Sequence, residues 1–317
     1  MGLVLCSQIR TVWHLYLFEG LLTGLGAPVS VALPLSVVAR WFTKNQGLAL
    51  AAASTGIGAG TALVPLLAAY LMEHLGWRTS YAVIGVLVWA VAVPSALLAM
   101  RRPKSGEVPG QNAEARTIPG QIAPTDHYSL SRALGTGAFW SLFFVYGLCI
   151  FALGMTMTHL VAHARDSGLA SVQAASLLSL IGVHSILGRL GAGALSDRIG
   201  ARPVLTAGIL LQAVFMVWLV RAGSPWMFYL FAALFGVTYG GNFVLMPRLT
   251  SQIFGSTSMG AIFGALSVAD GIGYGTGPWL AGRLYDATGS YDISFLMVAG
   301  GLLGAALLSF GLRKKPL

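Results

Sequence analysis

Residues 193–204 read GALSDRIGARPV, a charged segment between two apolar runs at 172–195 and 203–220. A bilayer core about 30 Å thick is crossed by roughly 20 helical residues, so each neighbouring run is about long enough to span a membrane. The charged segment is therefore predicted to join two transmembrane helices. Nine such runs occur, at 15–38, 48–72, 79–100, 136–163, 172–195, 203–220, 226–247, 258–284 and 291–312.

The composition supports the same class of protein. Hydrophobic residues make up 56% of the chain and charged residues 9%, and the mean hydropathy is +0.76. A soluble domain usually carries about 25% charged residues, so this chain has too few to cover a globule. Outer-membrane barrels show short alternating segments instead of long apolar runs. We therefore expect an all-α polytopic membrane protein with the lipid bilayer as its surroundings.

The distribution of the basic residues explains the net charge of +9. If nine crossings alternate, thirteen basic residues fall on one side and five on the other, and only Arg189 lies within a helix. This positive-inside bias predicts a cytoplasmic C-terminus and no nucleic-acid partner. The first side holds Arg40, Lys44, Arg101, Arg102, Lys104, Arg116, Arg132, Arg198, Arg202, Arg248, Arg313, Lys314 and Lys315, and the second holds Arg10, Arg78, Arg165, Arg221 and Arg283.

A polar stretch and an internal repeat divide the chain. Residues 101–135 form the only long polar segment, rich in Pro, Gly, Gln and Arg, and are predicted to be a cytoplasmic linker. It separates a partial N-terminal helix bundle at 1–100, with three helices, from a six-helix bundle at 136–317. At a shift of 213 residues, Gly and Pro recur in register, as expected for a transporter with two equivalent halves. The pairs are Pro34 with Pro247, Gly47 with Gly260, Gly58 with Gly271, Gly60 with Gly273, Pro65 with Pro278, and Gly76 with Gly289.

The repeat predicts that the front half is shorter than the back half. About 110 residues lie between the linker and Pro247, whereas 33 residues precede Pro34. We therefore expect that three helices are lacking before the first run, through a late start assignment or a truncated gene. In the second case the chain would be a remnant that transports nothing. Coding sequence upstream of Met1 would distinguish the two.

The segment 193–204 resembles the loop motif of the major facilitator superfamily. The matching positions are Gly193, Asp197, Arg198, Gly200 and Arg202. The resemblance implies twelve helices in a complete protein and alternating access around a central site. At a helix end, Asp197 can pair with an arginine and with the N-terminus of a neighbouring helix, which predicts a latch on the cytoplasmic side. The alternative is that these charges only fix the topology.

Further stretches narrow the resemblance. Residues 41–56, WFTKNQGLALAAASTG, resemble the pattern of monocarboxylate transporters, although Asn45, Gln46 and Ala51 depart from it. Residues 158–168 and 277–291 look like those of bacterial oxalate/formate antiporter-like proteins, which implies the bacterial inner membrane and a monomer. The positions that match the monocarboxylate-transporter pattern are Trp41, Phe42, Lys44, Leu48, Ala49, Ala53 and Gly56.

Arg189 is the main candidate for binding substrate. It precedes Asp197 by eight positions, about 12 Å along a helix, so it should lie well inside the bilayer. There an arginine costs at least about 2.5–3.5 kcal/mol on insertion scales and keeps its charge. Its planar fork suits a carboxylate, and monocarboxylate and oxalate transporters carry an arginine on the matching helix. The alternative is a structural ion pair with Asp270 or a bond to a helix-end carbonyl.

Three titratable residues within the apolar runs are candidates for proton coupling, namely Asp270, Glu19 and His184. Asp270 is near the midplane among glycines, which suggests an unwound or closely packed segment. Glu19 could instead reach the membrane interface, and His184 could serve in packing. Animal monocarboxylate carriers have an aspartate four residues before their arginine, where Ser185 stands in this chain.

Asn242, Tyr239 and Tyr146 are polar groups within apolar helices and are candidates for lining the substrate cavity. Two stretches of closely spaced glycines (56–60 and 271–277) have neither the preceding strand nor the following Lys-Ser/Thr of a phosphate loop. No catalytic triad or metal motif is present, so we expect no enzyme activity and no cofactor. Secondary transport of a small organic anion is the leading hypothesis. Proton-coupled efflux of hydrophobic compounds is the rival, although residues 56–65, GIGAGTALVP, match the efflux motif poorly.

Overall fold

The computed structural model describes residues 1–24, 26, 30, 34–35, 37–38, 41–42, 46–99, 128–255 and 258–312. Most of the predicted linker, 101–135, lies outside these residues. Nine of the thirteen basic residues assigned to the cytoplasmic side also lie outside them, so the described cations do not test the charge asymmetry. These nine are Arg40, Lys44, Arg101, Arg102, Lys104, Arg116, Arg313, Lys314 and Lys315.

The described part of the chain is helical and contains no strand. Seven of its segments are long and apolar enough to cross a membrane. α4 consists of two helices that meet at Gly76, where φ is 72°. The elements are α1 (Gly2–Cys6), α2 (Val12–Leu15), the π-helix η1 (Tyr16–Thr23), α4 (Gln46–Ala99), α6 (Leu130–Leu134), α7 (Gly137–Asp166), α8 (Ser171–Ile199), α9 (Ala201–Val220), α10 (Pro225–Phe254), α11 (Met259–Leu266), α12 (Val268–Thr288) and α13 (Asp292–Gly311).

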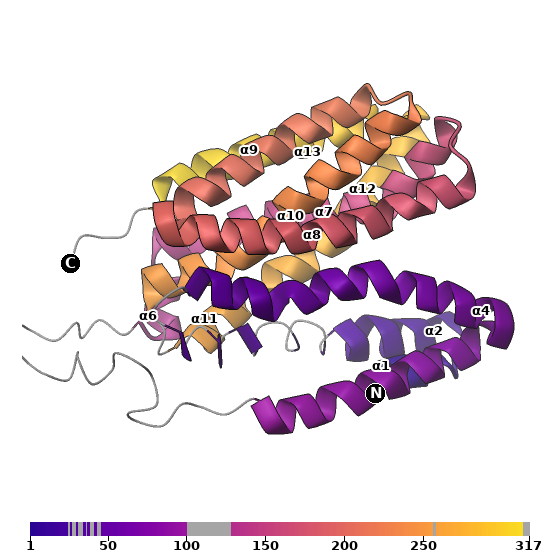
Figure 1. Cartoon of the computed structure of the whole chain (residues 1–317), viewed down its shortest axis with the longest axis horizontal. Coiled ribbons are helices and arrows are strands. Elements are labelled where there is room, and N and C mark those ends of the chain that lie inside the picture. Colours follow the sequence, from indigo (N-terminus) through magenta and orange to yellow (C-terminus); the bar gives the residue numbers. More distant parts are fainter. Residues whose placement is uncertain are drawn as a thin grey trace, which may run out of the picture.

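The helices form two groups that meet along one line. In the larger group α8 packs on α10, α9 packs on α13, and α12 packs on α7. The first helix of α4 runs along α8, and α1 packs on the second helix of α4, where Gly85 approaches Val4 (Figure 1). This arrangement of a back bundle with part of a front bundle is the expected partial fold.

Small residues bring α4 and α8 together. A Cβ atom at Gly193 would lie 2.6 Å from the Gly47 carbonyl oxygen, and one at Gly182 would lie 2.8 Å from the Ala62 nitrogen. Beyond Ala62 on α4, Leu63 and Leu67 are exposed. The two helices are therefore in close contact from the Asp197 end to about half of their length.

One pair of the internal repeat lies between two helices in both halves. Gly76 and Gly289 both have positive φ, 72° and 70°, and each precedes an apolar helix. The single run predicted at 258–284 is divided into α11 and α12 at Ser267. Gly273 of α12 lies so close to α7 that a Cβ there would be 2.5 Å from the Gly147 carbonyl oxygen. The expected discontinuity and close packing near Asp270 are both present.

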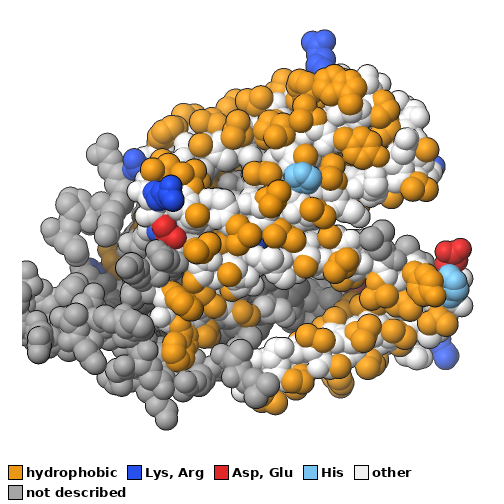
Figure 2. Space-filling model, in the orientation of Figure 1, with side chains coloured by type: hydrophobic (Ala, Val, Ile, Leu, Met, Phe, Trp, Pro, Cys, Tyr) orange, Lys and Arg blue, Asp and Glu red, His pale blue; other side chains and the backbone are white. Residues whose placement is uncertain are grey.

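The outer surface is that of a membrane protein. Hydrophobic side chains cover the long face of the molecule, whereas the acidic side chains visible in this view lie at the two ends of the helices (Figure 2). We refer to these as the Asp197 end, where α8 finishes and α9 begins, and the Gly76 end, where the two helices of α4 meet.

Two predicted helix ends are corrected by the structure. The segment 193–204 is not a loop, because α8 continues to Ile199, α9 begins at Ala201, and only Gly200, at φ 91°, separates them. Likewise α10 continues past the predicted end at residue 247 to Phe254, so Arg248 lies within a helix. The apolar runs correspond to the part of each helix inside the bilayer core. The helices are longer than the runs, because helical hydrogen bonding continues into the polar residues beyond them.

Candidate functional site

Arg189 lies on α8 in the middle of the molecule and has no exposed surface. Its Nη1 donates a hydrogen bond to Ser185 Oγ at 2.5 Å, and its Nη2 donates to the Tyr239 hydroxyl at 3.4 Å. The guanidinium carbon is 5.2 Å from the centre of the Tyr239 ring and 5.6 Å from that of Phe243, which are cation–π distances. Nε has no partner. Two hydroxyls and two rings therefore surround the charge.

No described carboxylate forms an ion pair with Arg189. The ion pair with Asp270, one of the alternatives suggested by the sequence, is therefore not present among the described residues. Asp270, in the first turn of α12, instead accepts a hydrogen bond from the Tyr146 hydroxyl at 3.2 Å. Its Oδ1 atom is buried without a partner. The site thus contains a buried cation and a largely buried carboxylate that do not neutralise each other directly.

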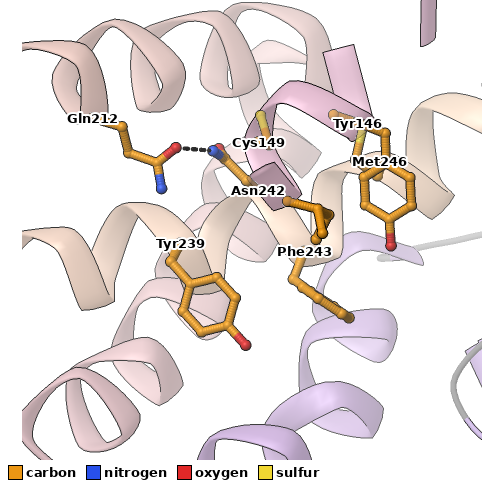
Figure 3. A pocket seen from close by; sticks show the side chains of 8 residues that line it. Tyr146, Cys149, Gln212, Tyr239, Asn242, Phe243 and Met246 are labelled. Atoms are coloured by element: carbon orange, nitrogen blue, oxygen red, sulfur yellow. Dashed lines mark hydrogen bonds between the residues drawn. The ribbon is translucent and has the colours of Figure 1, made fainter. Parts of the chain in front are cut away.

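The three polar residues proposed to line the cavity are brought together. Tyr146, Tyr239 and Asn242 line one small cavity, and Figure 3 shows the rings of Tyr146 and Tyr239 directed to the side where α4 runs. Asn242 Nδ2 donates to Gln212 Oε1 at 3.0 Å. The space between the lining residues has room for about one water molecule. The other lining residues are Cys149, Ile150, Gln212, Phe243 and Met246.

The structure does not bring Glu19 or His184 to this cavity. Glu19 belongs to η1 and accepts a hydrogen bond from the Cys6 thiol at 3.1 Å. The His184 ring is half-buried and its Nδ1 lies 3.0 Å from the Leu180 carbonyl oxygen of its own helix. Although His184 is adjacent to Ser185 in sequence, only Ser185 contacts Arg189.

At the Asp197 end, one carboxylate connects three helices. Asp197 accepts hydrogen bonds from the backbone nitrogens of Gly47 at 3.1 Å and Leu48 at 3.2 Å, in the first turn of α4. It also forms an ion pair with Arg248 of α10. Arg248 Nη1 donates in addition to Ser196 Oγ at 2.6 Å. The pairing expected for Asp197, with an arginine and with a helix N-terminus, is therefore present.

The other residues of the motif have different surroundings. Gly193 provides the close approach to Gly47, and Gly200 has the positive φ that ends α8. Arg198 is exposed. Arg202 donates to the carbonyl oxygens of Phe310 and Leu312 at 3.5 and 3.0 Å, which lie at the end of α13. Only Gly193 and Asp197 belong to the contact between the two groups of helices.

Three participants were not predicted from the sequence. Ser185 is the acceptor for Arg189, Gln212 is the partner of Asn242, and Arg248 is the partner of Asp197. The spacing of Ser185, one helical turn before Arg189, is a signal that could have identified it. Nothing in the sequence pairs Gln212 or Arg248 with its partner, since both contacts depend on how helices pack.

This arrangement of helices and the buried arginine indicate a membrane transport protein, and comparison with known proteins gives the family. The profile of the Major Facilitator Superfamily matches residues 1–191 and 142–317, so the chain belongs to that superfamily. It is 28% identical to human monocarboxylate transporter 12 over 353 residues, which cover all of this chain and 67% of the relative. It is also 28% identical to human monocarboxylate transporter 6, covering 98% of this chain and 64% of the relative.

Solved structures show the same fold. The fucose:proton symporter of E. coli superposes with a TM-score of 0.71 at 16% identity, covering 98% of this chain and 80% of that one. The human organic anion transporter MFSD10 superposes with a TM-score of 0.65 at 18% identity, covering 97% and 74%. The resemblance to monocarboxylate transporters and the partial major facilitator fold are thus confirmed. The chain spans about two thirds of the length of its monocarboxylate-transporter relatives.

Proposed function

We propose that this protein carries out secondary active transport of a small organic anion, a monocarboxylate or dicarboxylate, by alternating access. The observation that carries the proposal is Arg189, a fully buried guanidinium that no described carboxylate neutralises. An uncompensated charge inside a membrane is expensive and usually functional. A substrate carboxylate would supply the missing negative charge.

The geometry around Arg189 suits a carboxylate. The bond from Nη2 to the Tyr239 hydroxyl is long, 3.4 Å, and Nε is free. A planar carboxylate can accept two parallel bonds from a guanidinium, so it would replace a weak contact by two charge-assisted ones. Tyr239 and Tyr146 would then contact the remainder of the substrate.

The substrate must approach from the side of α4. The cavity beside Tyr239 holds about one water molecule, too little for an organic anion. The Tyr146 and Tyr239 rings are directed to the side where α4 runs (Figure 3). Movement of α4 relative to α8 would therefore open and close the site, as alternating access requires.

The Asp197 contact would act as the gate. It joins α4, α8 and α10 at one end of the molecule, and we assign that end to the cytoplasm. The state described would then be closed inside. This agrees with the similarity to the fucose transporter structure in its outward conformation, at a TM-score of 0.69. Gly200 would maintain the turn between α8 and α9, Arg202 would connect the start of α9 to the end of α13, and Arg198 would remain at the surface.

Proton coupling is assigned to Asp270. Its buried Oδ1 lacks a partner, and a proton there would remove the charge. Tyr146 connects this carboxylate to the cavity. Glu19 and His184 are the alternative candidates, but neither side chain contacts Arg189 or lines the cavity.

The charge pattern and the resemblance to bacterial proteins support a proposal for the cellular setting. We place the protein in a bacterial inner membrane as a monomer, with its C-terminus in the cytoplasm. Hydrophobic compounds are the rival substrate class, and a screen of labelled anions against lipophilic cations separates the two.

The test is uptake of labelled lactate and oxalate into proteoliposomes. The chain is reconstituted unaltered and with Arg189→Lys, which keeps the charge but loses the fork. We expect Arg189→Lys to reduce uptake at least about tenfold, since bonds to charged groups contribute about 1.5–3 kcal/mol. The same pair is tested with any coding sequence upstream of Met1 included, because the relatives are longer. Equal uptake by both proteins would remove Arg189 from the site.

A further inference from the structure

A groove runs along the lipid-facing side of the larger group, where α9 and α13 pack together. Its floor is Ala213 and Ala299, which are 3% and 4% exposed. Its walls are Val214, Val217 and Leu303, which are 47–60% exposed. Because small residues face each other between larger ones, an open space of about 550 Å³ remains. The groove therefore results from the small side chains at these positions of α9 and α13.

The groove has the length of one leaflet of a bilayer. On α9 its lining begins at Ala213 and ends at Arg221, which is eight residues or about 12 Å along the helix. Half of a hydrocarbon core is about 15 Å. One end of the groove is therefore near the membrane midplane and the other is near the surface at the Gly76 end.

Aromatic residues mark the position of that surface. The rings of Trp218 and Trp226 meet edge to face at 5.8 Å, and Trp218 Nε1 donates to the Met227 carbonyl oxygen at 3.3 Å. Tryptophan is enriched where headgroups meet hydrocarbon. Trp218 and Met227 also line the groove, so its outer mouth opens at headgroup depth.

Arg221 lines this mouth and caps the C-terminus of α9. It is exposed, and among the described residues it has no ion pair or side-chain hydrogen bond. A cation at this position stabilises the helix end, but this effect does not explain why the arginine lies beside a groove. The mouth therefore combines a free guanidinium with an apolar channel directed into the bilayer.

We propose that this groove binds an anionic glycerophospholipid, with one acyl chain between α9 and α13 and the phosphate on Arg221. The apolar lining matches an acyl chain along one leaflet. The guanidinium matches the phosphate, which it can bind through two parallel hydrogen bonds. The site is separate from Arg189 and does not depend on the transported substrate.

The test is native mass spectrometry of the full chain in detergent, titrated with phosphatidylglycerol or phosphatidylcholine. We expect one saturable phosphatidylglycerol adduct, held more tightly than phosphatidylcholine. Arg221→Gln should weaken phosphatidylglycerol binding about fivefold, the contribution of one basic residue near a membrane surface. Val217→Trp should weaken the binding of both lipids by filling the groove. Because Val217 is exposed, the larger ring does not enter the core.

Matched variants guard against general effects. Arg283→Gln removes an exposed cation from α12 toward the same end, and Leu230→Trp adds a ring to an exposed position of α10 outside the groove. Both should bind phosphatidylglycerol like the unaltered chain. The proposal is overturned if Arg221→Gln and Val217→Trp retain full binding, or if the two control variants lose as much as they do.

Discussion

Two buried arginines in this protein have opposite surroundings. Arg248, at the Asp197 end, forms an ion pair with Asp197 and donates a hydrogen bond to Ser196. Arg189, deeper in the same group of helices, has only the hydroxyls of Ser185 and Tyr239 and two aromatic rings. Arg248 is 8% exposed and Arg189 is 0% exposed, so the more deeply buried charge is the less compensated one.

The difference separates a structural charge from one available to a ligand. A buried pair satisfies both of its members, and removing one leaves the other without a partner. A buried cation without a carboxylate instead lowers the stability of the folded protein, and a bound anion would offset that loss. Arg248 therefore holds helices together, whereas Arg189 is ready to bind.

The largest expected effect is on stability at Arg248. Arg248→Met leaves Asp197 charged and without its partner, so we expect the free energy of unfolding to fall by about 3 kcal/mol. This is the lower limit for breaking a buried pair, because Asp197 keeps two backbone donors. Arg189→Met leaves no carboxylate without a partner, so it should leave the free energy of unfolding unchanged. Thermal unfolding in detergent measures both. Equal destabilisation by the two substitutions would remove the distinction between the arginines.

The next effect concerns the close approach that allows the Asp197 contact. A Cβ at Gly47 would lie 2.5 Å from the Gly193 carbonyl oxygen, so Gly47→Ala should destabilise the protein by about 1–3 kcal/mol through overpacking. Gly60→Ala on the same helix has open space around it and should be neutral or slightly stabilising. If Gly47→Ala is as mild as Gly60→Ala in thermal unfolding, the two helices are not held as closely as described.

A smaller effect is expected for proton coupling. Asp270→Asn should reduce lactate uptake driven by a pH gradient at least about fivefold, the lower end of typical coupling between two sites. Exchange of lactate without a gradient should continue, because Arg189 is unchanged. Glu19→Gln is the comparison. Loss of the gradient response in Glu19→Gln, with Asp270→Asn unaffected, would transfer the role to Glu19.

The smallest effect is expected at His184. Its ring contacts the backbone of its own helix and not Arg189, so His184→Gln should change uptake by less than about twofold, as for substitutions away from special contacts. The pH profile of uptake should stay the same. A displaced profile would show that His184 takes part in coupling after all.

The sequence predicted the parts of the structure that depend on hydropathy and local spacing. Apolar runs located the helices, and the glycine repeat indicated two related halves; Gly76 and Gly289, one pair of that repeat, both have positive φ. The burial of Arg189 followed from its distance to Asp197 along one helix. These features need only local periodicity and the thickness of a bilayer.

The partners could not be predicted in the same way. Asp197 was expected to pair with some arginine, but Arg248 was counted among the charges that set the topology because the apolar run ends at residue 247. An ion pair between Arg189 and Asp270 was one possibility from the sequence. In the structure Asp270 instead accepts a hydrogen bond from Tyr146. Which side chains meet depends on the rotation of each helix and on close packing at glycines, and neither can be read from hydropathy.

The most direct test of the account is equilibrium binding of labelled lactate and oxalate to purified protein in detergent. The unaltered chain should bind at least one of them saturably. Arg189→Met should show no saturable binding while unfolding at the same temperature as the unaltered chain. Saturable binding that persists in Arg189→Met, or that is absent from the unaltered chain, would contradict the claim that Arg189 is the carboxylate-binding group.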